Sequence, residues 1–386
     1  MKVLYIAHTS DNEGSSVALI NIAKGMQGRD IEYAVVCPDS KGALVASLHA
    51  MGIRVFVPRF QYAGFYVYPL TKNPLLWLKR MLGVALRELY GRWYLLKVVK
   101  VFHPDILHTN SGACALGWKI ARKMHIHHVW HIREYMDKDF GLTVIPSNRT
   151  YRDRLHSCDN YNIAITQSIF KHFNLRPVDE CIYDGVIDSH RAVGDAPAFG
   201  YPYFLFVGNI IKAKGVDALV DQFLSFHRSD DQHHLVLVGP YDRDPELFDS
   251  LQKKIAAADD SDYVHWLGRR TDVYELMRGA TALIVPSYNE GFGFITAEAM
   301  FCNCLVIGRD TAGTKEQFDK GKDESGGEIG LRFSSDSEMP SLMHLAATSN
   351  FDEIKKRALE VVLNNYTIEA NTQRIYKFYE NVLSQH

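Results

Sequence analysis

The sequence has little cysteine, no long apolar run and no excess of either charge, and each shortage excludes a class of protein. Six cysteines among 386 residues are too few for a disulfide framework. No stretch approaches the ~20 apolar residues of a membrane span, and the opening MKVLYIAHTSDNEG is too short in apolar residues for a signal peptide. Lys and Arg number 43 against 45 Asp and Glu, so the overall charge does not favour electrostatic binding to nucleic acid. We therefore expect a cytoplasmic protein without a nucleic-acid partner.

The composition is that of a globular protein, with 47% hydrophobic and 23% charged residues, and the length suggests two domains. Short apolar runs alternate with longer segments of helical character. The runs predict these strands: Val3–Ala7, Tyr33–Val36, Ile53–Pro58, Asp105–His108, His128–Ile132, Ile163–Thr166, Tyr203–Val207, His234–Val238, Val264–Leu267, Ala282–Val285 and Cys304–Ile307. Continuous apolar runs are typical of parallel strands covered on both faces, so we expect α/β domains with doubly wound, Rossmann-like sheets.

A break in this alternation falls at residues 191–202, RAVGDAPAFGYP, which contain two prolines and two glycines and show no periodicity. We interpret it as a linker between two Rossmann-like domains. The expected divisions are a first domain over 1–192, a second over 193–365 and a C-terminal segment over 366–386. Apolar residues at helical spacing in Thr367–Leu383 predict a helix there, packed back on the first domain.

One segment, residues 72–100, concentrates positive charge. It contains a single acid, Glu88, and seven basic residues: Lys72, Lys79, Arg80, Arg87, Arg92, Lys97 and Lys100. Leucines and two tryptophans, Trp77 and Trp93, are interleaved with them. A basic amphipathic helix of this kind suits an anionic membrane surface. The alternative is a domain helix with its apolar face in the core and its charges solvated.

The most informative stretch is ALIVPSYNEGFGFITAEAMFCNCLVI, residues 282–307. A strand leads into a turn containing Gly291 and Gly293, and a helix follows. Glycines allow close backbone approach, and the unpaired N–H groups of a first helical turn attract phosphate. Glu290 precedes the turn and Glu298 follows it, so a ligand with a diphosphate between two sugars fits this pattern. Two unrelated surface carboxylates are the alternative.

A second candidate is FLFVGNIIKAKG, residues 204–215, where a strand runs into a loop ending at Lys214. A lysine at the carboxyl end of a strand can neutralise a departing diphosphate. Taken alone, Lys214 is better explained as a surface lysine.

Together these residues carry a resemblance to glycosyltransferase family 4, the retaining enzymes of the GT-B architecture. The run from Glu290 to Glu298 resembles that family's E-x7-E signature, and VGNIIKAKG resembles its V-G-R-x-x-x-x-K-G. Other segments follow in family order: HHLVLVGP, VHWLGR, ALIVPS, TAGTKE and SGGEIGLRF. AHTSDNEGSS, DILHTNSG, VWHIRE and IYDGV in the first half are similar more weakly. The resemblance implies two Rossmann-like domains facing across a cleft.

The resemblance also implies roles for single residues. Glu298 would bind the ribose hydroxyls of a nucleotide-sugar, and Glu290 the hydroxyls of the transferred sugar. Lys214 would meet the diphosphate. The amides of Gly291, Phe292, Gly293 and Phe294 would meet donor sugar and phosphate. In the first domain, Gly14, followed by Ser15, would let its loop close over the donor.

Two departures from the family pattern stand out. The family has an arginine where this chain has Asn209, so another cation must complete the diphosphate site or donor affinity is lower. Arg133 and Arg269 are the candidates for that cation. The family often has histidine at the position of Arg133, and His131 lies two residues earlier, so either of them could face the donor sugar.

Two other patterns suggest metals. Asp242 and Asp244 form a D-x-D, but they follow an apolar strand, and we interpret them as loop residues. His125, His127, His128 and His131 lie close in sequence, but on a strand His128 and His131 would point to opposite faces. We therefore expect neither a metal nor a cofactor. The absence of G-x-G-x-x-G after the first strand disfavours a nicotinamide dehydrogenase.

The expected function is transfer of a hexosyl-type group from a UDP- or GDP-type donor to a hydroxyl of a glycan or lipid-linked acceptor, with retention. The expected setting is surface polysaccharide or glycolipid assembly at the cytoplasmic side of a membrane. The alternatives are a nucleotide-sugar 2-epimerase of the same architecture and a nucleotide-sugar-binding protein without turnover, which the departure at Asn209 suggests.

Overall fold

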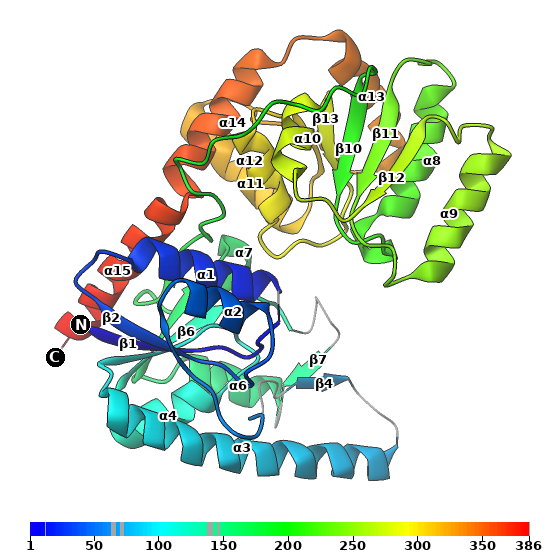
Figure 1. The fold of residues 1–386 in the computed structure, drawn as a ribbon. Helices are drawn as coiled ribbons and strands as arrows, with labels where there is room; N and C mark the ends of the chain where they lie inside the picture. The colour runs from blue at the N-terminus through cyan, green and yellow to red at the C-terminus, as the bar shows by residue number, and fades with distance from the viewer. Residues whose placement is uncertain (12, 63–66, 70–72, 137–141, 145–146, 386) are drawn as a thin grey trace. The chain divides into compact units, whose positions relative to one another are not determined.

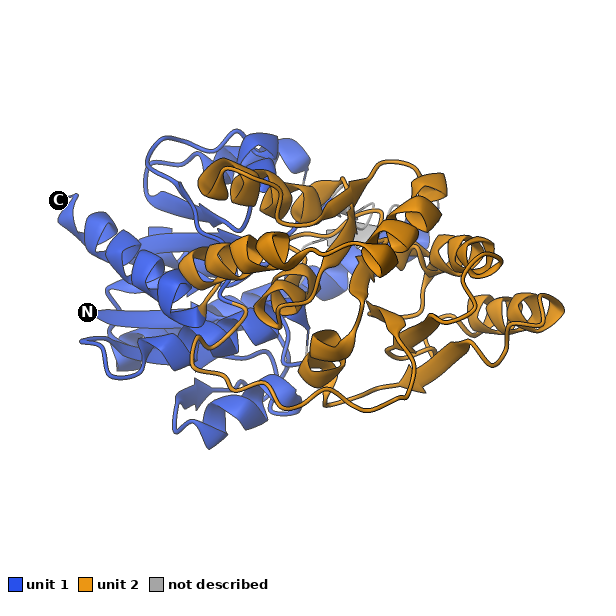
Figure 2. Ribbon diagram, turned by 90° about the horizontal axis from the view of Figure 1, so that it is seen from above, with its two compact units in different colours: residues 1–185, 368–386 blue, residues 186–367 orange. Residues whose placement is uncertain are grey.

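The computed structural model describes the chain except residues 12, 63–66, 70–72, 137–141, 145–146 and 386 (Figure 1). Contacts divide it into two units, one comprising 1–185 with 368–386 and the other 186–367 (Figure 2). Each unit is built on a parallel sheet. The prediction of two Rossmann-like α/β domains is confirmed.

The first unit contains a seven-stranded sheet in the order β3-β2-β1-β5-β6-β8-β9. Its strands are β1 (Lys2–Ile6), β2 (Glu32–Val36), β3 (Arg54–Phe56), β5 (Ile106–Thr109), β6 (His127–Ile132), β8 (Asn160–Ala164) and β9 (Glu180–Cys181). Its helices are α1 (Gly14–Met26), α2 (Ala43–Ala50), α3 (Pro74–Phe102), α4 (Leu116–Met124), α6 (Asn148–Leu155), α7 (Gln167–His172) and α15 (Ile368–Ser384). A separate antiparallel pair joins β4 (Val67–Pro69) to β7 (Leu142–Val144).

Both faces of this sheet are covered, which explains the unbroken apolar runs of the sequence. Tyr5 of β1 belongs to a core shared with α1, α2 and α15, whereas Ile6 points to the opposite face, where it lies against Gly117 of α4. Helix α15 returns to this unit as predicted. It approaches α1 so closely that a Cβ on Gly25 would lie 2.5 Å from Thr372.

The second unit contains a six-stranded parallel sheet in the order β12-β11-β10-β13-β14-β15. Its strands are β10 (Tyr203–Val207), β11 (His234–Val238), β12 (Val264–Gly268), β13 (Ala282–Val285), β14 (Val306–Arg309) and β15 (Leu331–Phe333). Its α-helices are α8 (Val216–His227), α9 (Pro245–Ala257), α10 (Val273–Gly279), α11 (Phe294–Phe301), α12 (Ala312–Ser325), α13 (Met339–Thr348) and α14 (Asp352–Asn365). Two short 3-10 turns are η1 (Lys212–Lys214) and η2 (Asp336–Glu338).

The unit boundaries differ from the sequence-based divisions after 192 and 365. The Pro- and Gly-containing segment 191–202 is irregular, but hydrogen bonds attach it to the second unit. Arg278 donates to the carbonyl of Val193 at 2.8 Å, and the N–H of Gly194 donates to Glu275 at 3.2 Å. The division falls earlier, at 185/186, because Val186 N–H already donates to Tyr366 O at 2.8 Å.

Candidate functional site

The order of the second sheet defines where its site is expected. Strands β10 and β13 are neighbours, although two further strands separate them in the sequence. In a doubly wound sheet, ligands bind at the carboxyl ends of the strands where the order reverses, because the crossover helices leave there towards opposite faces. The loops after β10 and β13 are those that contain Lys214 and Glu290.

The loop after β10 is held against the start of the loop after β13. Gly215 has a φ of +67°, and a Cβ there would lie 2.3 Å from the carbonyl oxygen of Pro286. The N–H of Tyr288 donates to Ala213 O at 3.3 Å. Glycine is therefore required at position 215, both for its backbone conformation and for the close approach that brings Lys214 beside β13.

Lys214 and Glu290 meet at this edge. Nζ of Lys214 lies 2.5 Å from Oε1 of Glu290, and the two side chains are 27% and 16% exposed. The sequence singled out both residues separately, 76 positions apart, and the fold brings them into direct contact. A cation and a carboxylate that solvent still reaches can bind a diphosphate and a sugar hydroxyl, respectively.

The turn after Glu290 leads into α11 through Gly293, whose φ is +85°. Its carbonyls are anchored from α12. Gln317 Nε2 donates to Phe292 O at 2.6 Å and to Gly293 O at 3.0 Å, and Gly313 N–H donates to Glu290 O at 2.9 Å. In a trans peptide the N–H of each residue points opposite to the carbonyl of the residue before it, so these bonds orient the amides of Gly291, Gly293 and Phe294 away from α12. The loop is thus a preorganised set of donors.

Glu298 lies on α11, about one helical turn after the Gly293 turn. Tyr274 of α10 donates its hydroxyl to Glu298 Oε1 at 3.1 Å, and the Arg191 guanidinium lies 3.8 Å from the centre of the Tyr274 ring. Burial raises the pKa of Glu298, although the Tyr274 hydrogen bond and the Arg191 charge act in the opposite direction. The carboxylate is therefore costly to desolvate and well placed to accept further hydrogen bonds.

The structure adds a cation that sequence reasoning missed. Arg309, at the end of β14, is buried, donates to Pro286 O at 2.9 Å and pairs with Asp336. Its guanidinium also lies 4.4 Å from the ring centre of Tyr288. Arg309 therefore holds the loop after β13 through its contacts with Pro286 and Tyr288. A charged residue ending the apolar run CLVIGR was the signal that could have found it.

The two sequence candidates for a replacement cation belong to different units. Arg269 follows β12 and is exposed. Asn209 follows β10 and is half-buried, and its carbonyl accepts the N–H of Ile211 at 3.0 Å. Arg133 belongs to the first unit.

Arg133 and His131 are enclosed within the first unit. Arg133 Nη1 lies 2.6 Å from Asp184 Oδ2, its Nε donates to Asn110 O at 3.2 Å, and both ion-pair partners are almost fully buried. His131 is completely buried, 3.3 Å from both His108 and Arg133. Burial, together with the charge of Arg133, holds the pKa of His131 well below its usual range. As arranged here, the pair ties β5, β6 and β9 together rather than facing solvent.

Gly14 and Ser15 begin α1 directly after the β1 loop. A Cβ on Gly14 would meet no atom within 4 Å, so packing does not require glycine there. Ser15 is half-buried, and its carbonyl accepts from Asn110 Nδ2 at 2.8 Å. Asn110 thus links this loop to Arg133. Sequence reasoning missed Asn110 and Asp184, although both lie in segments that resemble family motifs.

The metal-like patterns have structural explanations. Asp244 caps α9 by accepting the N–H of Leu247 at 3.2 Å. His128 is buried between Thr109 and Asn160, at 2.8 and 2.6 Å, and burial lowers its pKa to about 4. Within the part of the chain that the structure describes, no group of three or more His, Cys, Asp or Glu side chains is placed to hold a metal ion.

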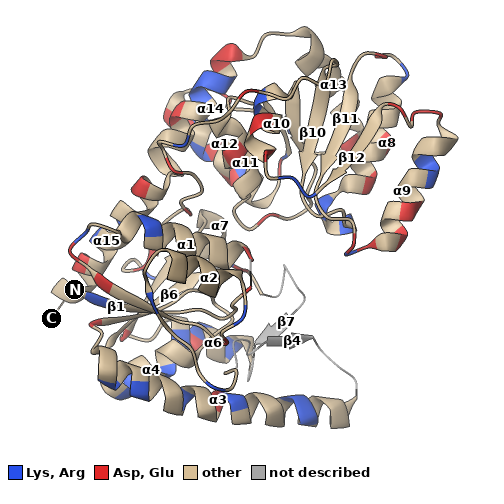
Figure 3. Cartoon of the chain, viewed as in Figure 1, with Lys and Arg blue, Asp and Glu red and all other residues tan. Residues whose placement is uncertain are grey.

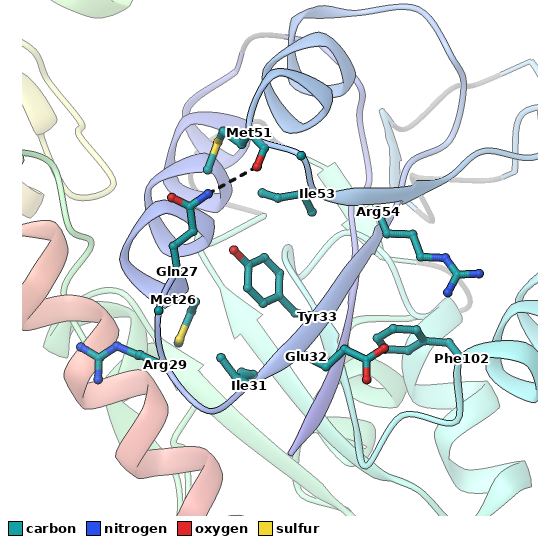
Figure 4. Close-up of a pocket in the computed structure, with 12 residues that line it drawn as sticks. Met26, Gln27, Arg29, Ile31, Glu32, Tyr33, Met51, Ile53, Arg54 and Phe102 are labelled. Carbon is teal, nitrogen blue, oxygen red and sulfur yellow. Dashed lines mark hydrogen bonds between the residues drawn. The ribbon is translucent and has the colours of Figure 1, made fainter.

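A surface pocket of about 380 Å³ lies elsewhere in the first unit (Figure 4). It is lined by the beginnings of β2 and β3, including Glu32, Tyr33 and Arg54, and is bridged by a 3.4 Å hydrogen bond from Gln27 to Met51 O. This is the amino end of the strands, opposite to the edge at which doubly wound sheets bind ligands. We therefore do not include it in the candidate site.

Comparison with known proteins gives one family match and several partial relatives. Residues 196–330 match the family model described as glycosyl transferases group 1. An uncharacterized glycosyltransferase of Methanocaldococcus jannaschii is 32% identical over 118 residues, which cover 30% of this chain and 31% of the relative's chain. The N,N'-diacetylbacillosaminyl-diphospho-undecaprenol alpha-1,3-N-acetylgalactosaminyltransferase of Campylobacter jejuni is 30% identical over 115 residues, covering 30% and 28%. The chain thus spans less than a third of the length of these relatives.

The fold comparison covers the whole chain. The crystal structure of Anabaena HepE in complex with UDP has a TM-score of 0.77 at 19% identity, covering 99% of this chain and 100% of that one. At that identity the likeness shows the fold alone. The chain therefore has the GT-B fold expected from its sequence, and its residues 196–330 are similar to the group 1 glycosyl transferases.

Proposed function

We propose that this chain is a retaining glycosyltransferase of family 4, which moves a hexosyl-type sugar from a nucleoside diphosphate to an acceptor hydroxyl. One observation carries the proposal: Lys214 and Glu290 are paired at 2.5 Å where the order of the second sheet reverses. The family match over 196–330 includes both residues and Glu298.

In this proposal the second unit binds the donor. Glu298 accepts hydrogen bonds from the ribose hydroxyls, and Glu290 accepts them from hydroxyls of the transferred sugar. The backbone amides of residues 291–294 donate hydrogen bonds to the sugar and the diphosphate. A UDP-type donor is supported by the UDP in the HepE crystal structure, and a GDP-type donor is the other candidate. The first unit binds the acceptor, with Gly14 and Ser15 on its donor-side loop.

The chemical step breaks the bond between the anomeric carbon and the diphosphate oxygen and forms a bond to the acceptor oxygen, whose proton is released. Negative charge builds on the departing diphosphate as the carbon becomes oxocarbenium-like. Fixed amides and Lys214 stabilise that charge without reorganising, which is where catalysis gains most. This chemistry calls for neither a metal nor a cofactor. Retention requires the acceptor oxygen to approach from the face that the diphosphate leaves.

A lipid-linked or glycan acceptor in surface polysaccharide or glycolipid assembly fits the diphospho-undecaprenol named for the Campylobacter relative. The corresponding location is the cytoplasm, at the inner face of the membrane. Among the described residues, no helix is long and apolar enough to cross a bilayer.

The test begins with a thermal-shift screen of UDP- and GDP-sugars and then follows release of the nucleoside diphosphate with and without a lipid or glycan extract as acceptor. A transferase releases it in an acceptor-dependent way. An epimerase interconverts the donor sugar without acceptor, and a binding protein does neither. Loss of release in Lys214→Ala, with Lys212→Ala as the matched control on the same turn, links activity to this site.

A further inference from the structure

Helix α3 has two apolar faces, and within the described part of the chain one of them packs on the first unit while the other is exposed. The covered face packs on the first unit through these residues: Val84, Gly91, Leu95, Val98, Val99 and Phe102. Gly91 marks a close approach, because a Cβ there would lie 2.8 Å from Tyr62. These contacts account for the helix as part of the domain, but not for the rest of its apolar residues.

The second face is an exposed stripe. We define the α3 stripe as Leu75, Leu78, Leu82, Leu86, Leu89 and Trp93, which follow one another at intervals of three or four residues. Their exposed fractions run from 52% to 78%. On a regular helix the centre of this stripe lies roughly 160° from the centre of the covered face. An ordinary domain helix has charged residues there, so this stripe needs a partner of its own.

Positive charge surrounds the stripe. The helix carries six basic residues and one acid between 74 and 102, and Figure 3 shows the basic residues spaced along its length. Lys79, Lys97 and Lys100 are exposed and lie within about 60° of the stripe's centre. The acid, Glu88, is 15% exposed and pairs with Arg92 and with Lys119 of α4, so its charge is neutralised.

We propose that the α3 stripe docks on an anionic lipid surface. Leucines and a tryptophan enter the interfacial region, while the flanking lysines meet acidic headgroups. A second copy of the chain is the less favourable occupant, because symmetric pairing would bring two strongly basic helices together. The remainder of the chain is net negative, so an anionic surface repels it and favours contact through α3.

The structure corrects one alternative from the sequence. If residues 72–100 were only a domain helix, Trp77 and Leu78 would be buried, yet they are 51% and 61% exposed. Lys72 lies outside the described residues. The docking proposal is independent of the proposed transferase function, because lipid binding is measured without nucleotide or acceptor.

Co-sedimentation of the full chain with vesicles tests the proposal. Vesicles of phosphatidylcholine alone are compared with vesicles containing about 30% phosphatidylglycerol, at low and high salt. The stripe variant is Leu82→Gln, Leu86→Gln and Leu89→Gln, and the charge variant is Lys79→Glu, Lys97→Glu and Lys100→Glu. All six side chains are exposed, so folding is preserved.

Control variants make the same types of substitution on the second unit. The leucine control has two substitutions where the stripe variant has three: Leu345→Gln and Leu363→Gln replace leucines that are 42% and 41% exposed. Arg243→Glu, Lys253→Glu and Lys356→Glu reproduce the charge change at exposed positions. We expect salt-sensitive binding to anionic vesicles only, weakened on the order of 100-fold in the charge variant and by at least about tenfold in the stripe variant, with both controls unchanged.

Three results would overturn the proposal. Equal binding to neutral and anionic vesicles would show that lipid charge does not contribute to binding. Equal binding by both α3 variants and the wild type places any lipid contact elsewhere. A lipid-independent dimer that the stripe variant converts to a monomer, without vesicle binding, assigns the stripe to a second copy of the chain.

Discussion

Replacing Glu298 by Gln tests the donor site with little disturbance to the fold. The side chain lies on α11, and Tyr274 donates a hydrogen bond to its Oε1 at 3.1 Å. Glutamine keeps an oxygen for that bond and removes the charge. Because burial raises the pKa of Glu298, its carboxylate is a destabilising charge in the folded chain, and its removal should leave the melting temperature unchanged or higher.

The expected loss appears in donor binding. Two hydrogen bonds from vicinal ribose hydroxyls to a buried carboxylate are together worth about 2–4 kcal/mol. Glu298→Ala, which removes both acceptors, should therefore raise the Kd for a nucleoside diphosphate by roughly 30- to 1000-fold. Glu298→Gln should lie between this variant and the wild type, because its oxygen still accepts but carries no charge. Tyr274→Phe, which removes only the bond that orients the carboxylate, should cost about 1 kcal/mol.

Titration calorimetry with UDP and GDP measures the Kd values of these variants. The control is Glu353→Gln, which makes the same substitution at an exposed position on α14. Acidification should weaken binding in the wild type as Glu298 takes up a proton, starting at higher pH than for an ordinary glutamate. The Glu298→Gln variant should lack this component. A folded Glu298→Ala variant with unchanged Kd would refute the assignment of this residue to the ribose.

Four further predictions follow from the same geometry. Lys214→Ala should lower kcat/KM by on the order of 100-fold, mainly in kcat, with Lys212→Ala near wild type; a loss confined to KM would restrict Lys214 to ground-state binding. Asn209→Arg should lower the Kd for donor, measured by calorimetry, and no change would mean that another cation already acts there. EDTA should leave transfer unaffected, whereas activity restored by Mg²⁺ or Mn²⁺ would return Asp242 and Asp244 to consideration as ligands. Burial lowers the pKa values of His108, His128 and His131, so below about pH 6.5 the unfolded chain binds more protons than the folded chain. The free energy of unfolding should therefore fall as the pH drops below this value. If the melting temperature of His128→Gln depended on pH as steeply as that of the wild type, this prediction would be contradicted.

The fold was predictable because its strands carry their own signal. Val3 to Ile6 are fully buried, and such runs with helices between them permit few arrangements other than a doubly wound sheet. The short strands β9 and β15 escaped prediction because two or three residues hold no periodicity. The unit boundary was misplaced because Pro and Gly in 191–202 indicate only an irregular backbone. The boundary depends on hydrogen bonds between distant residues, such as the bond from Val186 N–H to Tyr366 O.

The candidate site was predictable only in part. Lys214 and Glu290 follow apolar strands, so their placement at the carboxyl edge could be read from the sequence, but their pairing depends on strand order. Arg133 was a candidate cation for the diphosphate site, and the structure places it in a buried ion pair with Asp184, 51 residues away. Nothing local distinguishes the two cases, because burial of a charge depends on whether a distant partner is brought to it.

The pairing of Lys214 with Glu290 has a consequence for how a donor could enter. A diphosphate must replace the carboxylate as the partner of Lys214, while a sugar hydroxyl takes the place of the ammonium group at Glu290. Both side chains retain some contact with solvent, which screens the attraction between them. A diphosphate offers Lys214 more negative charge than one carboxylate does, so the exchange favours the donor. Each residue thus holds the other near its binding position, and the site is ordered beforehand at little cost to affinity.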